Sequence, residues 1–139
     1  VDAIVSLHPE FSKNIYVVEI IPSLRDILER KGYNLVGLDF LQHEEMYDRI
    51  IMNPPFEKHR DIDHVLHAYS LLNSGGRLVS IMSAGSFSSS CLKKRIDFQQ
   101  WFQYVGGGFW QLDSDSFKGI KAFRQTSVNV CMVVIEKSL

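Results

Sequence analysis

The four residues Asn53-Pro54-Pro55-Phe56 constrain the fold of this chain more than any other segment. They directly follow residues 49–52, a short apolar run rich in β-branched side chains that is typical of a buried strand. Two prolines cannot continue that strand, because each lacks an N–H group and fixes its own φ. The strand therefore ends abruptly, with an amide, rigid carbonyls and an aromatic ring at its carboxyl end. In an open parallel α/β sheet, ligands bind at that edge.

These groups suit a reaction at an exocyclic amine of a nucleobase. Such an amine is a poor nucleophile, because its lone pair is delocalised into the ring. Two hydrogen-bond acceptors beside its N–H bonds favour a pyramidal nitrogen, and the Asn53 side-chain oxygen and the Pro54 carbonyl are both acceptors. Phe56 offers a face on which a planar ring can stack. A base in a duplex would have to be flipped out to reach this pocket.

Residues 47–56 resemble the catalytic motif of the amino-methyltransferases that use S-adenosylmethionine, in particular the N6-adenine DNA methyltransferases. The resemblance implies that Asn53, Pro54, Pro55 and Phe56 form the catalytic centre, with S-adenosylmethionine as cofactor and a flipped adenine of DNA as substrate. Similar Asn-Pro-Pro-aromatic motifs occur in enzymes that methylate RNA bases or protein glutamine. Those substrates therefore stay open as alternatives.

The pattern of the chain predicts an α/β fold in which strands alternate with helices. Residues 2–7 are read as the tail of a helix. We expect strands at residues 15–18, 35–38, 49–52, 78–82, 109–112 and 127–135, and helices at residues 22–31, 61–72 and 88–105. The sheet is expected to be mostly parallel, with an antiparallel hairpin formed by the last two strands. This order resembles a Rossmann-like class I methyltransferase sheet.

Two acidic residues follow the first two expected strands and are candidates for cofactor binding. Glu19, next to Ile20, can accept both hydroxyls of an adenosine ribose, as acidic residues do in dinucleotide-binding folds; the alternative is a solvated strand end. The resemblance implies that Asp39 and Phe40 contact the cofactor's adenine, and that Ile20 and Asn53 also belong to the cofactor site. The alternative for Asp39 is a cap on a helix or turn.

The family's first motif, a strand followed by a glycine-rich turn and a helix, does not precede Glu19 in this sequence. The triplet Gly106-Gly107-Gly108 is no substitute, because it follows a helical pattern and comes after the Asn53 motif. We therefore expect a sheet that lacks its first strand, whose place is between the strands ending at Glu19 and Met52. A module that resembles a methyltransferase but binds a nucleic acid or protein partner without catalysis is the alternative that this absence favours.

The 139 residues suit one domain, taken as residues 1–139 of a methyltransferase catalytic domain that is incomplete at its N-terminus. A chain of this length has no room for a separate target-recognition domain, so we expect sequence specificity from another domain or subunit. The sequence carries no signal of oligomeric state. Cys91 and Cys131 have no metal-ligand spacing, which predicts reduced thiols, no metal site and a cytoplasmic protein. No apolar run approaches membrane-spanning length.

The formal net charge of −1 gives no global attraction to nucleic-acid phosphates, so DNA contacts would have to come from local basic clusters. Residues 93–95 form one cluster; Lys118, Lys121 and Arg124 form the other. Both could contact phosphates, although clusters of this size are usually solvated faces. Phe117 and Phe123 are candidates to line the base pocket, with packing of the hairpin as the alternative.

Overall fold

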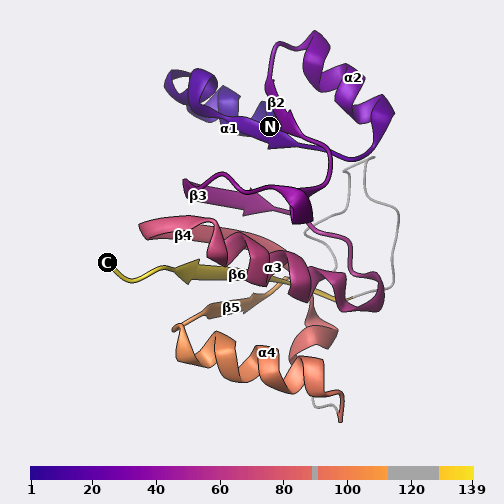
Figure 1. The fold of residues 1–139 in the computed structure, drawn as a ribbon, viewed down its shortest axis with the longest axis vertical. Coiled ribbons are helices and arrows are strands. Elements are labelled where there is room, and N and C mark those ends of the chain that lie inside the picture. Colours follow the sequence, from indigo (N-terminus) through magenta and orange to yellow (C-terminus); the bar gives the residue numbers. More distant parts are fainter. Residues whose placement is uncertain (89–90, 113–128) are drawn as a thin grey trace. The chain divides into compact units, whose positions relative to one another are not determined.

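The computed structural model describes residues 1–88, 91–112 and 129–139 of the chain. These residues fall into two compact units, Val1–Glu44 and Glu45–Leu139. Strands alternate with helices in both units, as the sequence predicts (Figure 1). The assignment of residues 1–139 to one domain stays a prediction.

The first unit contains a two-stranded parallel sheet with short helices. Its elements are α1 (Asp2–Leu7), a 3-10 helix (Pro9–Asn14), β1 (Tyr16–Val18), α2 (Pro22–Arg30), β2 (Asn34–Gly37) and a second 3-10 helix (Phe40–Gln42). Helix α2 begins at a proline, which suits the first turn because no N–H partner is needed there. Gly32, with φ of +76°, follows its end and takes a left-handed conformation that glycine adopts without strain.

The second unit is built on a four-stranded mixed sheet. Its elements are β3 (Tyr47–Met52), a 3-10 helix (Glu57–His59), α3 (Arg60–Ser70), β4 (Leu72–Ser83), a 3-10 helix (Ala84–Phe87), α4 (Lys93–Tyr104), β5 (Gly108–Gln111) and β6 (Val130–Glu136). The strand order is β3-β4-β6-β5; β3 and β4 are parallel, and β6 is antiparallel to both of its neighbours. The expected antiparallel hairpin is therefore confirmed, with the last strand inserted between β4 and β5.

The described strands form two separate sheets, β1-β2 and β3-β4-β6-β5. Within the described residues, no strand pairs with both β1 and β3. The expected absence of a first strand between the strands ending at Glu19 and Met52 stays a prediction.

The core of the second unit lies on one face of its sheet. Residues Ile50, Leu78, Met82, Cys131, Val133 and Ile135 point to this face and are buried. Helix α3 covers it with the buried side chains of Ile62, Val65 and Ala68, and α4 adds Phe98 and Phe102. Tyr69 of α3 meets Trp101 of α4 edge to face, so the two helices lie side by side. On the other face, Ile51 is 65% exposed.

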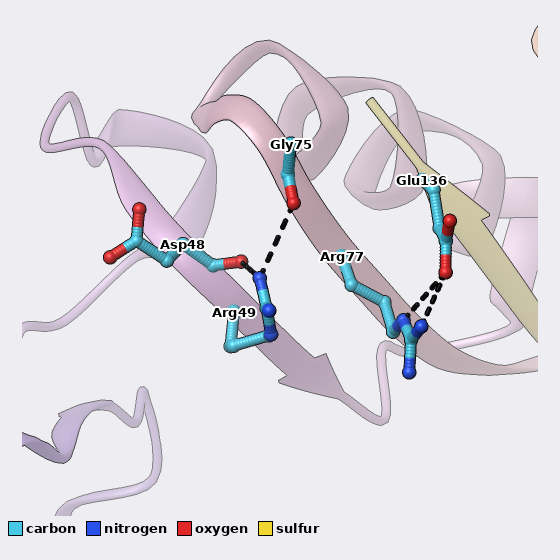
Figure 2. Close-up of polar contacts among 5 residues, drawn as sticks. All are labelled: Asp48, Arg49, Gly75, Arg77 and Glu136. Atoms are coloured by element: carbon cyan, nitrogen blue, oxygen red, sulfur yellow. Dashed lines mark hydrogen bonds and ion pairs between the residues drawn. The ribbon is translucent and has the colours of Figure 1, made fainter. Parts of the chain in front are cut away.

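Polar contacts hold β3, β4 and β6 together where β3 begins and β6 ends (Figure 2). Arg77 on β4 donates through Nε to Oε1 of Glu136 at 2.9 Å, in the register that pairs these two residues across the strands. Arg49 on β3 donates through Nη1 to the carbonyl oxygens of Asp48 and Gly75. These bonds help fix the strand register, because a slip by one residue would move every side chain to the wrong face.

Two expected element boundaries are wrong, and a third lies partly outside the described residues. The strand expected from residue 78 begins at Leu72, because Gly75 and Gly76 exchange backbone hydrogen bonds with Lys137 beyond the end of β6. The helix expected from residue 88 begins at Lys93, after the Ala84–Phe87 turn. The last strand is described from Val130; residues 127 and 128 of the expected strand lie outside the described residues.

The packing of α4 leads to a stability prediction. Phe102 is buried against Phe87 and Phe98, and Phe102→Ala should lower the free energy of unfolding by about 3–5 kcal/mol through lost burial and a residual cavity. Tyr104, on the same helix and 89% exposed, is the control. Tyr104→Ala should change the free energy of unfolding by less than about 0.5 kcal/mol. Urea unfolding of both variants checks this; equal losses would contradict the assigned core.

Candidate active site

The Asn53–Phe56 segment begins at the residue after β3, at the carboxyl end of that strand. Asn53 is exposed, Pro54 is buried, Pro55 is exposed and Phe56 is half-buried. Neither the Asn53 amide nor the Pro54 carbonyl makes a hydrogen bond within the described part of the chain. Two acceptors in sequence are thus left without protein partners at a sheet edge, and this arrangement suits binding of a ligand that carries N–H donors.

The backbone just after this segment adopts an unfavourable conformation. Lys58 and His59 have φ of +53° and +58°, the left-handed region in which a β-carbon crowds the following carbonyl. Each such residue costs about 1–2 kcal/mol, so the surrounding structure must hold it there. The two residues turn the chain from the proline pair into helix α3, which begins at Arg60.

Asp61, in the first turn of α3, anchors the far end of this segment. Its side chain is fully buried, and Oδ2 accepts from the Ser83 backbone N–H and from the Ser86 hydroxyl, both at 3.0 Å. The other oxygen, Oδ1, has no hydrogen-bond partner among the described residues. An acid is favoured at a helix start, so the sequence analysis assigns no special role to Asp61. Its position on the same helix face as Val65 and Ala68 was the signal that it is buried.

The turn at residues 83–88 begins at the last residue of β4 and is fixed by hydrogen bonds and aromatic contacts. The Ser83 hydroxyl accepts from the Gly85 N–H at 3.2 Å, and Gln99 of α4 donates to the carbonyls of Ser86 and Ser88. Phe87 packs edge to face against three aromatic rings, those of Phe98, Phe102 and Phe109. Because β3 and β4 are parallel neighbours, this turn and the Asn53–Phe56 segment leave the sheet at the same edge.

The predicted cofactor residues lie in the first unit, at the carboxyl ends of its two parallel strands. Glu19 follows β1 and is half-buried; its Oε1 accepts from the Ile21 N–H at 2.9 Å. Asp39 follows β2 by two residues, and its Oδ1 accepts from the Leu41 N–H at 3.0 Å, which caps the short 3-10 helix. The structure thus brings Glu19 and Asp39 to one edge of the β1-β2 sheet. It also shows the capping contact that was the alternative reading of Asp39.

The two neighbours of these acids differ in exposure. Ile20 is 63% exposed, whereas Phe40 is half-buried. The Glu19–Phe40 group belongs to one compact unit and the Asn53–Phe56 group to the other. The cofactor and catalytic roles of all these residues stay predictions.

The basic cluster at residues 93–95 is largely occupied by protein contacts. Lys93 pairs with Asp97 at 3.0 Å, Lys94 pairs with Asp63 at 2.7 Å, and Arg95 donates to the Ser88 hydroxyl. This favours the reading of a solvated face over a phosphate site. The second cluster, Lys118, Lys121 and Arg124, and the candidate pocket residues Phe117 and Phe123 lie outside the described residues.

Two cavities, of about 320 and 240 Å³, are lined by other residues: the first by Val5, Ser12, Lys13, Lys31, Gly32, Tyr33 and Asn34, the second by Val105, Gly106, Gly108, Trp110, Val134 and Glu136. Among the described residues, no cluster of three His, Cys, Asp or Glu side chains could hold a metal ion. The helices of the described ranges include none that is long and apolar enough to cross a membrane.

Comparison with solved structures defines the fold. The M protein of the type I restriction enzyme EcoKI superposes with a TM-score of 0.69 at 14% identity, over 88% of this chain and 30% of that one. The plantazolicin methyltransferase BpumL, solved with a desmethylPZN analog and SAH, gives 0.62 at 12% identity, over 99% and 72%. A proposed class I S-adenosylmethionine-dependent methyltransferase of Listeria monocytogenes gives 0.62 at 13% identity, over 89% and 44%.

The chain therefore has the Rossmann-like fold of the class I methyltransferases, as the sequence predicts. It spans less than a third of the EcoKI M protein and less than half of the Listeria protein. No family model matches the sequence, and no curated protein matches it.

The left-handed backbone at Lys58 leads to a second prediction. Lys58→Gly should raise the free energy of unfolding by up to about 1 kcal/mol, because glycine tolerates positive φ. Lys58→Val should lower it by about 1–2 kcal/mol, because a β-branched side chain tolerates that region worst. Lys58 is exposed, so changes in packing should contribute little. Thermal unfolding of the two variants checks the prediction, and stabilisation by valine would contradict the assigned φ.

Burial at the Cys131 thiol leads to a third prediction. Desolvation and, second, the nearby Asp61 carboxylate raise the pKa of this thiol to about 12. A thiol reacts as its thiolate, so Cys131 should stay unreactive at about pH 8 and should be further protected by its burial. A disulfide-exchange reagent should therefore label only the exposed Cys91 in the native protein, and both thiols in urea. Labelling of both thiols in the native protein would show that β6 is not buried as described.

Proposed function

We propose that this chain is part of an S-adenosylmethionine-dependent methyltransferase that methylates the N6 amine of adenine in DNA. One observation carries the proposal. On a class I methyltransferase fold, the Asn53 amide is exposed at the carboxyl end of β3, and neither it nor the Pro54 carbonyl has a hydrogen-bond partner in the described ranges of the chain. The EcoKI M protein, part of a restriction enzyme, has a similar fold, which agrees with a DNA substrate.

In this mechanism the chain binds and orients the amine. The Asn53 side-chain oxygen and the Pro54 carbonyl accept one N–H each, which draws the nitrogen toward a pyramidal geometry and frees its lone pair. The half-buried ring of Phe56 stacks on the flipped base, and the rigid Pro55 limits movement of the segment. Catalysis rests mainly on placing the nucleophile in line with the methyl group.

The first unit has hydrogen-bond acceptors that suit the adenosine half of the cofactor. In the described part of the chain, Oε1 of Glu19 is used by the Ile21 N–H and Oε2 makes no hydrogen bond, so Oε2 can accept from ribose hydroxyls. Asp39 and Phe40 would contact the adenine. When bound, S-adenosylmethionine supplies a methyl group activated by the positive sulfur. The methylated ammonium product is acidic enough to lose its proton to water, so no general base is assigned.

The test is the variant Asn53→Ala in the full-length protein. Loss of the acceptor should lower methyl transfer by about 10²–10³-fold, because the amine would no longer be held in its reactive geometry. The affinity for S-adenosylmethionine should change little. Asn73→Ala is the matched control: Asn73 lies at the opposite end of the sheet, where it donates to Asp48, and its loss should leave transfer within about twofold.

The readout is the mass of methylated nucleosides after digestion of DNA, with RNA and glutamine-containing peptides assayed in parallel. N6-methyladenine in DNA supports the proposal. Methylated RNA or glutamine would instead assign one of the other amine or amide substrates. Binding of S-adenosylmethionine in calorimetry without transfer to any acceptor, or no binding at all, would favour the noncatalytic module. Normal turnover by Asn53→Ala would remove the proposed role of the amide.

A further inference from the structure

Asp61 is a buried carboxylate whose contacts join the two segments at the candidate site. It lies eight residues after Asn53, in the first turn of α3, and its side chain is fully inaccessible to solvent. Both hydrogen bonds of Oδ2 go to the turn after β4, at Ser83 and Ser86. The carboxylate thus ties the end of the Asn53 segment to the turn that leaves the neighbouring strand.

Burial makes a carboxylate at this position expensive. A charged group loses its hydration inside a protein, and only hydrogen bonds to the charged form compensate. Here two donors meet one oxygen, while Oδ1 has no partner in the described residues. A buried apolar side chain would carry no such desolvation cost, so packing alone does not explain an acid at this position.

The segment between Asn53 and Asp61 needs to be held at both ends. At its start, β3 pairs with β4 through Met52 and Ser80. Near its end come Lys58 and His59, both left-handed, which would relax if the chain were free. The Asp61 bonds follow directly and fix the first turn of α3 to the end of β4.

We propose, on the basis of the proposed function, that Asp61 is a positioning residue for the methyl acceptor. Its carboxylate holds the turn at residues 83–88 beside Asn53–Phe56, so that the two segments form opposite walls for the flipped base. Asp61 itself does not touch the reacting atoms. Because both walls belong to the second unit, its loss should affect the acceptor and leave binding at the Glu19 and Asp39 side unchanged.

The decisive variant is Asp61→Asn in the full-length protein, because it keeps the shape and removes the charge. The amide oxygen can take the place of Oδ2, but a neutral amide accepts more weakly than a carboxylate, and the NH₂ group would be buried where Oδ1 has no partner among the described residues. The KM for adenine-containing DNA should rise by about tenfold or more, while the Kd for S-adenosylmethionine should stay within about twofold. Ser86→Ala, which removes only one donor, should shift KM in the same direction by a smaller factor.

Asp63→Asn is the matched control. Asp63 lies two residues further on the same helix and pairs with Lys94 at the surface. This variant should leave the KM for DNA and the Kd for S-adenosylmethionine unchanged within about twofold, because a surface ion pair contributes little to the stability of the fold. If Asp61→Asn behaves like Asp63→Asn, or if it weakens DNA and cofactor binding equally, Asp61 is only a structural residue and the proposal is wrong.

Amide hydrogen exchange tests the same claim without relying on methyl transfer. In Asp61→Asn the amides of residues 53, 56–60 and 83–87 should exchange about tenfold faster than in the wild type, whereas those of β6 and of residues 72–82 in β4 should not. Unchanged exchange in both segments would overturn the proposal. Faster exchange together with no transfer by the wild type to any acceptor would refute the proposed function and leave the positioning contact established. If Asp61→Asn does not fold, Ser86→Ala is compared with the wild type in both measurements.

Discussion

The parallel pairing of β3 with β4 is the constraint on which the candidate site depends. Ile50 pairs with Leu78 and Met52 with Ser80, so both strands run toward the same edge and bury the same face. A shift of one residue would expose Ile50 and Leu78 and would turn the chain before Asn53 to the wrong side. The register therefore determines both the core and the point at which the proline pair leaves the sheet.

The first unit lacks a comparable core. His43 is the only buried residue among residues 1–44, and large apolar side chains such as Leu7, Ile20 and Leu38 are more than half exposed. Apolar burial is the main favourable term in folding, so a unit that buries so little cannot be stable through its internal contacts alone.

The sequence predicted what depends on local pattern and failed where distant contacts decide. The strand before Asn53 and the spacing of Ile62 and Val65 were visible as periodic apolar positions, and the structure confirms both elements. The extension of β4 back to Leu72 was not visible, because it results from pairing of Gly75 and Gly76 with Lys137. The role of Asp61 was missed for the same reason, since its partners Ser83 and Ser86 are more than twenty residues away.

The two ends of the β3-β4-β6 sheet differ in how completely their polar groups are paired. At one end, Asp48 accepts from Asn73, Arg77 pairs with Glu136, and Lys137 donates to the Leu72 carbonyl at 2.7 Å. The other end has two left-handed residues, and three acceptors there have no hydrogen-bond partner among the described residues: the Asn53 amide oxygen, the Pro54 carbonyl and Oδ1 of the buried Asp61. Departures from local rules in otherwise consistent folds concentrate at functional sites, because binding requires groups that folding leaves unpaired. The polar groups at one end of this sheet are therefore paired with each other, whereas acceptors at the end that carries the Asn53 segment remain available to a ligand.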